Sequence, residues 1–159
     1  MHRSTISIGA GFALAGSAAF DVQAAGDDAA SATITSGDFH GFSEDADLDI
    51  GGHAWMVRTG DEHTVVLIHI TGLEAGTEYA AHIHAAACGV DDADGHYMND
   101  PDAAAEPPNE IWPGPVAADS DGVAHGYTEA DFVAGDDAVS VVVHRPGDTP
   151  NKIACADLG

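Results

Sequence analysis

Short segments rich in β-forming residues, split by Gly, Asp and Pro, constrain the fold of this chain more than any other sequence feature. No stretch shows the 3.6-residue apolar period of an amphipathic helix. Six segments are expected to form strands, at residues 52–58, 64–71, 78–85, 122–128, 138–144 and 152–158. Short strands at regular spacing predict an all-β fold, a sandwich or a barrel.

Glycine-containing turns connect the first three expected strands. Thr-Gly-Asp at residues 59–61 follows the first strand, and Gly-Leu-Glu-Ala-Gly at residues 72–76 follows the second. We therefore expect both successive pairs to be antiparallel neighbours. Residues 87–120 then hold five of the seven prolines and many Asp residues. An irregular connection of this length inside a compact domain is usually functional.

The N-terminal residues have the character of an export signal. Residues 1–25 combine a weakly positive start, a short apolar run and a small-residue cleavage pattern, and the run is too short to span a bilayer. Residues 26–38 are expected to form a flexible linker and residues 39–159 a single domain. Export would place the two cysteines, Cys88 and Cys155, in an oxidising compartment where a structural disulfide is expected.

The chain is strongly acidic. Its 27 Asp and Glu against 4 Lys and Arg give a formal net charge of −23, which excludes nucleic acid as a natural partner. The acidic residues are spread along a chain that is 45% hydrophobic, which favours a folded domain over a disordered one. Screening in molar salt, where the Debye length is about 3 Å, would reduce the self-repulsion. We therefore expect a secreted protein of a high-salt organism.

Four of the ten histidines form a pattern that is typical of metal sites. His82 and His84 are two residues apart on an expected strand, so their side chains point to the same face. His96 follows a loop, and His144 ends the apolar run at residues 139–143. Imidazole ligands suit copper, zinc, iron or nickel without selecting one. The sequence assigns no role to the other six histidines, which are His2, His40, His53, His63, His69 and His125.

The order of these features resembles a known family. Along the chain come the turn Thr71-Gly72-Leu73-Glu74-Ala75-Gly76, His82-x-His84, Cys88, Gly95-His96-Tyr97, the turn Asp119-Ser120-Asp121-Gly122-Val123, Val141-Val142-Val143-His144 and Ala154-Cys155. From about residue 52 to residue 159 this order resembles the copper/zinc superoxide dismutase family. The resemblance implies a Greek-key β-barrel or sandwich with a copper site.

The same resemblance implies roles for individual residues. His82, His84 and His144 match the ligands that bind copper alone, and His96 matches the histidine that bridges copper and zinc. Cys88 and Cys155 match the disulfide of the family.

The zinc ligands of the two-metal enzymes are missing. No histidine occurs between His96 and His125, and residues 109–114 replace the stretch that carries the second zinc histidine and the aspartate. A tetrahedral zinc site needs four donors. The chain therefore resembles the copper-only branch, and we expect copper without zinc. The second nitrogen of His96 then needs another partner, for which we expect Glu110, with Asp100 as the alternative.

Two cations lie near the proposed ligands in the sequence. Lys152 stands three residues before the last cysteine, where the family carries an arginine, and Arg145 follows His144 directly. Both are candidates to attract a small anion, although Lys lacks the planar fork of Arg. The segment between His144 and Cys155 is shorter than in the two-metal enzymes, so we expect a more open copper site.

The resemblance implies an oxidoreductase that converts superoxide to oxygen and hydrogen peroxide at a mononuclear copper site. His96 would take up and return a proton, since histidine is suited to acid–base chemistry near neutral pH. Two alternatives remain open: an extracytoplasmic copper-binding or copper-carrying protein without turnover, and a metal-free structural β-module. No pattern in the sequence indicates an oligomeric state.

Overall fold

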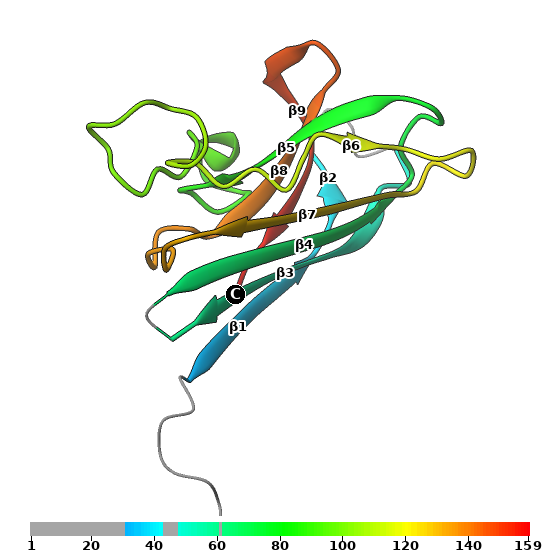
Figure 1. The fold of residues 1–159 in the computed structure, drawn as a ribbon. Helices are drawn as coiled ribbons and strands as arrows, with labels where there is room; N and C mark the ends of the chain where they lie inside the picture. The colour runs from blue at the N-terminus through cyan, green and yellow to red at the C-terminus, as the bar shows by residue number, and fades with distance from the viewer. Residues whose placement is uncertain (1–30, 43–47, 61) are drawn as a thin grey trace, which may run out of the picture.

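The chain folds into two antiparallel β-sheets packed face to face (Figure 1). The computed structural model describes residues 31–42, 48–60 and 62–159, so the predicted signal peptide lies outside the described residues. Within those ranges the helical content is a single 3-10 turn, η2 (Asp91–Ala93). The all-β prediction is confirmed. Over the same residues, no helix has the length and apolar character needed to cross a membrane.

The first sheet has four strands in the order β1-β3-β4-β7. Its members are β1 (Ala32–Asp38), β3 (Gly51–Thr59), β4 (His63–Thr71) and β7 (Ala124–Ala130). Burial alternates along β4: Thr64, Val66, Ile68 and Ile70 are buried. This period of two places one face of the sheet on the core and leaves the other face outside.

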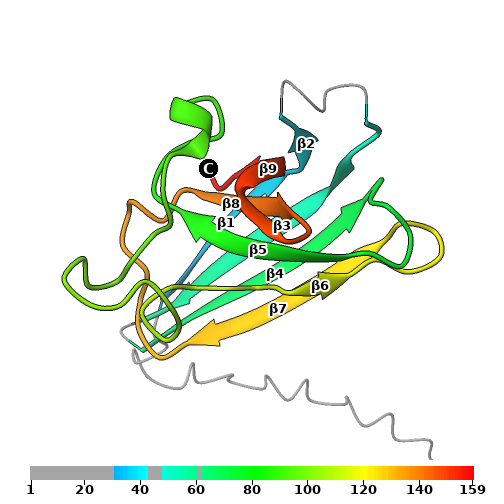
Figure 2. The same cartoon turned by 90° about the horizontal axis from the view of Figure 1, so that it is seen from above.

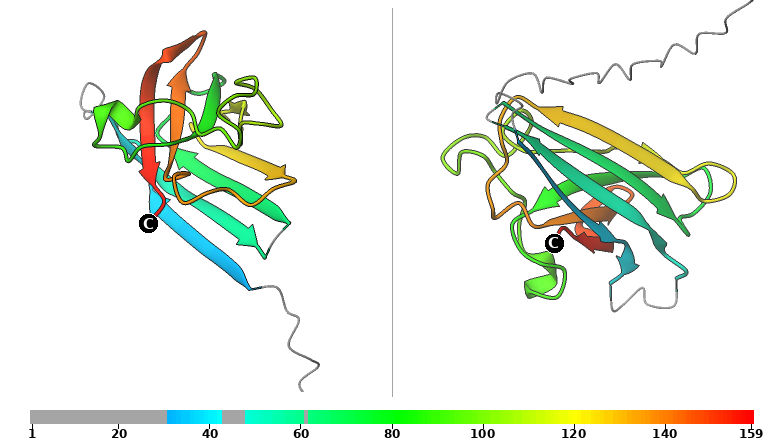
Figure 3. Two further views of the ribbon diagram at one scale, coloured as in Figure 1. Left: turned by 90° about the vertical axis from the view of Figure 1, so that its left-hand side faces the viewer. Right: turned by 90° about the horizontal axis from the view of Figure 1, so that it is seen from below.

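The second sheet has five strands in the order β2-β9-β8-β5-β6. Its members are β2 (His40–Gly41), β5 (Glu78–His84), β6 (Val116–Ala117), β8 (Ser140–Arg145) and β9 (Asp148–Asp157). Figure 2 shows β5 and β8 lying over the strands of the first sheet, and both views of Figure 3 show the two layers. Ser140 to His144 are all buried, as expected of a strand inside the sheet. The long connection after β5 extends from one end of the sandwich (Figure 1).

The predicted linker at residues 26–38 is wrong for its second half. Residues 32–38 form β1, which pairs with β3 along its whole length, from Ala32↔Thr59 to Asp38↔His53. The sequence predicts a linker here because the segment consists mostly of Ala, Ser, Thr, Gly and Asp with little apolar pattern. In the structure its one large apolar residue, Ile34, is 65% exposed. Its β-branched residues nevertheless fit a strand at the edge of a sheet. The folded domain therefore includes these residues, while residues 26–30 lie outside the described part of the chain.

The two predicted strand pairs have different outcomes. β3 and β4 are antiparallel neighbours, as predicted. The predicted pairing of β4 with β5 is wrong, because β5 pairs with β8 and β6 in the other sheet. Gly72 has a φ of +81°, and a Cβ there would lie 2.1 Å from the carbonyl oxygen of Asp49, so this glycine is required for a crossing between sheets. Turn residues do not distinguish such a crossing from a hairpin.

Side chains of the first sheet hold the segment that leads into β8. The Arg58 guanidinium donates hydrogen bonds of 2.9 to 3.2 Å to three carbonyl oxygens, those of Ala134, Gly135 and Ala138. The fully buried Thr64 contributes two more bonds to the same segment. These contacts fasten the segment before β8 to the first sheet.

The substitution Thr64→Val tests this arrangement. The Thr64 hydroxyl donates to the Phe132 carbonyl at 2.9 Å and accepts from the Ala134 amide at 2.7 Å. Valine keeps the shape and removes both bonds, so we expect the free energy of unfolding to fall by about 1–3 kcal/mol in urea titrations. Thr33→Val on exposed β1 is the control and should change it by less than about 0.5 kcal/mol. Equal effects of the two substitutions would contradict the interpretation.

Candidate metal centre

The register between β5 and β8 brings three histidines together. His82 and His84 lie on β5, and His144 lies on its neighbour β8. Ala80 pairs with His144 and His82 pairs with Val142, so His144 lies diagonally across from His82. Diagonal cross-strand neighbours are within reach of long side chains. All three imidazoles are buried, with at most 4% of each residue exposed.

The fourth histidine comes from the long connection after β5. His96 forms an isolated antiparallel bridge with His84, and the Tyr97 amide donates to the Ile83 carbonyl at 2.9 Å. This short stretch therefore lies alongside β5 as an added edge. It carries the His96 ring into the group already formed by β5 and β8.

The four rings direct nitrogen atoms at one point. One ring nitrogen from each of His82, His84, His96 and His144 lies within 4.8 Å of the others. His82 Nδ1 is 2.9 Å from His96 Nε2, and His84 Nε2 is 3.3 Å from His144 Nε2. Two nitrogens bound to one ion at about 2.0–2.1 Å would be separated by about 2.9–3.4 Å at bond angles between about 90° and 110°. These two pairs have the spacing of ligands on one ion, and the four nitrogens together could hold a metal ion.

Burial keeps His82 and His84 uncharged. Loss of solvation, followed by the neighbouring histidines, lowers the pKa of His82 to about 3. Burial is also the largest cause that lowers the pKa of His84 to about 3, opposed by its hydrogen bond to Ala93. Neutral imidazole is the form that binds metals. His82 and His84 are thus ready to bind a metal across the physiological pH range.

A buried carboxylate holds the outer nitrogen of His96. His96 Nδ1 lies 2.9 Å from Glu110 Oε2, and the Trp112 indole N–H donates to the same oxygen at 2.6 Å. Glu110 is 3% exposed and is placed by a β-bridge to Met98. A proton shared between His96 Nδ1 and the carboxylate leaves Nε2 to face the cluster. The expectation from the sequence that a carboxylate lies here is met by Glu110.

Asp100, the alternative partner for His96, makes its hydrogen bonds within the long connection instead. Its carboxylate accepts a hydrogen bond from the Asp102 amide at 3.0 Å in an exposed turn, and its amide binds the Asn109 side chain. Asp100 therefore stabilises the long connection locally.

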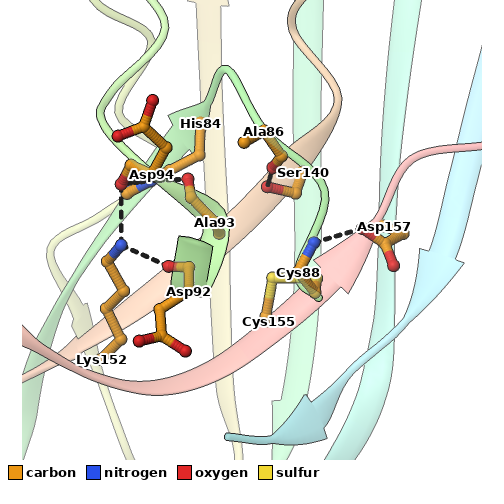
Figure 4. Close-up of a disulfide and its surroundings, with 10 residues drawn as sticks. All are labelled: His84, Ala86, Cys88, Asp92, Ala93, Asp94, Ser140, Lys152, Cys155 and Asp157. Carbon is orange, nitrogen blue, oxygen red and sulfur yellow. Dashed lines mark hydrogen bonds between the residues drawn. A yellow bond between two sulfur atoms is a disulfide. The ribbon is translucent and has the colours of Figure 1, made fainter. Parts of the chain in front are cut away.

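A left-handed turn orients His84. Residues 91–94 all have positive φ, between 41° and 64°, although none is glycine. In this conformation the Ala93 and Asp94 carbonyl oxygens point at His84 Nδ1, at 3.0 and 3.2 Å (Figure 4). The proton on Nδ1 is thereby directed to the turn, and Nε2 faces the cluster.

Lys152 binds the same turn from β9. Its ammonium donates to the Asp92 carbonyl and, at 2.7 Å, to the Asp94 carbonyl (Figure 4). Burial lowers the pKa of Lys152, while the charges of Asp92 and Asp94 oppose the shift. Lys152 therefore fixes the turn that orients His84. The second predicted cation, Arg145, ends β8 and lines a polar pocket together with Lys152 and Asp91.

A disulfide fixes the start of the long connection. Cys88 is bonded to Cys155 on β9, as expected, and the Cys88 amide donates to the Asp157 carboxylate at 2.7 Å (Figure 4). Nearby, the Ser140 hydroxyl donates to the Ala86 carbonyl at 2.7 Å. The segment between His84 and His96 is thus tied to both β8 and β9. Structural disulfides of this kind indicate an extracytoplasmic protein.

An apolar pocket opens onto one side of the cluster. Its lining includes His82 and His96 together with Ala80, Trp112, Gly114, Pro115 and Pro150. The side chain of His96 is 28% exposed, so this ring is the part of the cluster that solvent reaches. A small solute can therefore approach the metal centre on the His96 side.

Comparison with protein-family models and with curated proteins finds no match for this chain. The structure itself shows an all-β sandwich with a buried four-histidine cluster and a disulfide. The cluster brings together the four histidines named from the sequence. Trp112 and the carbonyls of the left-handed turn were missed, because nothing in their sequence context indicates a contact with the site.

Acidification tests the neutrality of the cluster in the metal-free protein. The pKa values of His82 and His84 are about 3 in the folded state and about 6.5 in an unfolded chain, so the unfolded chain binds more protons below about pH 6.5. The free energy of unfolding should therefore decrease steadily as the pH falls from about 6.5 towards 3. Urea titrations between about pH 7 and 5, above the range of ordinary carboxylates, isolate this contribution.

The control is His40→Ala, which removes an exposed histidine of β2 and should leave the slope of stability against pH unchanged. A metal-free protein whose stability is constant or rises over this range would show that the cluster is not buried in the neutral form.

Proposed function

We propose that this protein is a copper-dependent superoxide dismutase that works without zinc. The observation that carries the proposal is the double contact of His96, whose Nε2 lies 2.9 Å from His82 Nδ1 and whose Nδ1 lies 2.9 Å from Glu110. In the two-metal enzymes that the sequence resembles, the corresponding histidine bridges copper and zinc. Here a buried carboxylate takes the place of the second metal.

Two broader features support the same assignment. The disulfide ties the metal-site connection to the last strand, as in the family. Consecutive strands β4 and β5 belong to different sheets, as do β7 and β8, which is compatible with a Greek-key arrangement. The disulfide and the acidic surface support a secreted protein adapted to salt.

The donor set favours copper. All four candidate ligands are imidazoles, and both cysteines are used in the disulfide, so no thiolate competes for the ion. Among divalent first-row metals, copper binds nitrogen ligands most tightly. A separate zinc ion beside His96 would need further donors, and the contact to His96 Nδ1 is already made by Glu110.

Copper, when bound, would supply the alternation between Cu(II) and Cu(I) by which one superoxide is oxidised to oxygen and the next is reduced to hydrogen peroxide. The protein would supply the proton. His96 is the ring that solvent reaches, so its Nε2 can take up a proton and return it while Nδ1 stays bound to Glu110. Glu110 would keep the His96 ring in place while Nε2 carries the proton.

Lys152 and Arg145 would attract the anionic substrate. In a chain of net charge −23 with only four Lys and Arg, these two cations line one pocket, which Asp91 and Asp92 also line, and Lys152 binds the turn that contacts His84. Lys152 also holds the turn that orients His84, so its role includes positioning.

A copper carrier without turnover is the second candidate. The observation in its favour is that the Lys152 ammonium is engaged by two carbonyl oxygens, which reduces its availability to an anion. A metal-free structural module is the weakest alternative, since desolvation of four clustered imidazoles has a free-energy cost that metal binding would offset.

Superoxide decay and metal content of one copper-loaded sample test the proposal. We expect rapid decay in molar salt with about one tightly bound copper and no zinc. Tightly bound copper without decay would establish the carrier instead. A protein with no tightly bound copper would overturn the metal site.

The substitution Glu110→Gln tests the carboxylate that holds His96. The amide cannot accept the His96 proton as strongly, so we expect copper affinity and turnover to fall by about 10–100-fold, with a changed electron paramagnetic resonance spectrum of the bound copper. Glu106→Gln changes an exposed residue of the same connection and should leave the copper affinity, the turnover and the spectrum unchanged. If Glu110→Gln behaves like this control, Glu110 does not support the copper site.

A further inference from the structure

Three histidines outside the metal centre form a row across the first sheet. His53 on β3 pairs with His69 on β4, and His69 pairs with His125 on β7. Directly opposed residues of antiparallel strands lie on the same face with Cβ atoms about 4.5–5.5 Å apart. This arrangement could not be predicted from the sequence, because the three residues are far apart along the chain and only the strand register aligns them.

The row lies on the outer face of the sheet. Alternate residues of β4 are buried, and His69 belongs to the other, outward-facing set, where it is half-buried. His125 is exposed, and its ring centroid lies 4.8 Å from that of His69. These two imidazoles already stand side by side at the distance of a cross-strand pair.

A carboxylate extends the row and orients its first histidine. Asp38 on β1 pairs with His53, and its Oδ1 lies 2.6 Å from His53 Nδ1. A proton on Nδ1 directed at this carboxylate leaves Nε2 with its lone pair, which is the arrangement that protein metal sites use to prepare an imidazole. The contact between His53 and Asp38 on the surface is thus of the same kind as the contact between His96 and Glu110 in the buried centre.

The middle ring has an unused nitrogen. His69 Nδ1 is buried and makes no hydrogen bond to any residue that the structure describes. A buried polar atom without a partner is destabilising, and a bound ligand would remove that cost. His69 lies between His53 and His125, so a ligand on its Nδ1 would be within reach of both neighbours.

We propose that His53, His69 and His125 bind a second divalent transition-metal ion, such as Cu²⁺ or Zn²⁺, on the outer face of the first sheet. Three imidazoles suit either ion, and a chain of net charge −23 attracts divalent cations. Among the described residues the buried cluster is the one group of side chains that converges as metal ligands, so binding in the row requires its three imidazoles to rotate onto the ion. Rotamer changes of surface side chains occur in picoseconds to nanoseconds.

The two tryptophans of the chain make the sites separately observable. The Trp55 ring lies 4.4 Å from the His53 ring, whereas the Trp112 ring lies 4.9 Å from the His82 ring of the buried centre. Trp112→Phe leaves Trp55 as the one tryptophan of the chain. Quenching of Trp55 fluorescence by Cu²⁺ then reports the outer row, and competition with Zn²⁺ reports the second metal.

We expect saturable quenching of Trp55 in the Trp112→Phe protein, and equilibrium dialysis of the unsubstituted protein should find one copper beyond that of the buried centre. His69→Ala and His125→Ala should each weaken the quenching by at least about tenfold, and Asp38→Asn should weaken it by a similar factor. His40→Ala, which removes an exposed histidine of the other sheet, should have no effect.

Circular dichroism and thermal melting show whether each variant is folded, and His125→Ala and Asp38→Asn alter exposed side chains, so they carry the test if His69→Ala does not fold. Unquenched Trp55 in the presence of excess Cu²⁺ would overturn the proposal. Quenching that His125→Ala and Asp38→Asn leave unchanged would overturn it as well. Both results are independent of the copper content of the buried centre.

Discussion

The packing of four imidazoles against one another is the constraint on which the rest of the structure depends. Burial, together with the charges that the neighbouring histidines would carry, lowers the pKa values of His82 and His84 to about 3, so these two rings are packed in the neutral form. Each neutral ring must also direct its one N–H away from the centre. The protein meets this requirement with carbonyl oxygens for His84 and a buried carboxylate for His96. The convergence of the four lone pairs is therefore a property of the surrounding hydrogen bonds as much as of the histidines.

Those hydrogen bonds require an irregular segment to hold one conformation. Residues 91–94 occupy left-handed backbone conformations that cost about 1–2 kcal/mol for each non-glycine residue. The Lys152 ammonium offsets part of this cost by binding two carbonyls of the turn, and the Cys88–Cys155 disulfide limits the conformations open to the segment before it. The cation thus belongs to the scaffold of the site, whichever effect it also has on an approaching anion.

The histidines and most of the strands could be predicted because their signals are local. His82 and His84 are two residues apart on a strand, so the sequence alone places both side chains on one face. The carboxylate near His96 could be predicted because a metal-bound imidazole usually donates a hydrogen bond from its second nitrogen. The strand β1 was missed because its large apolar residue, Ile34, faces outward. The crossing at Gly72 was missed because hairpins and crossings use the same turn residues. The partners of Lys152 could not be predicted at all, since backbone carbonyls are identical in every residue and only the fold selects among them.

Strand register generates two sets of histidines in this protein, and their surroundings give them different properties. In the buried centre, desolvation has already removed the proton, so metal binding there does not compete with protonation near neutral pH. In the outer row, the rings do not converge on one point and must first be drawn together before they can hold an ion. Scarce metal ions would therefore fill the buried centre first, and the outer row would take up ions only in excess. In concentrated salt the attraction of the acidic surface is screened within about 3 Å, so ligand geometry, rather than net charge, determines which ions the outer row retains.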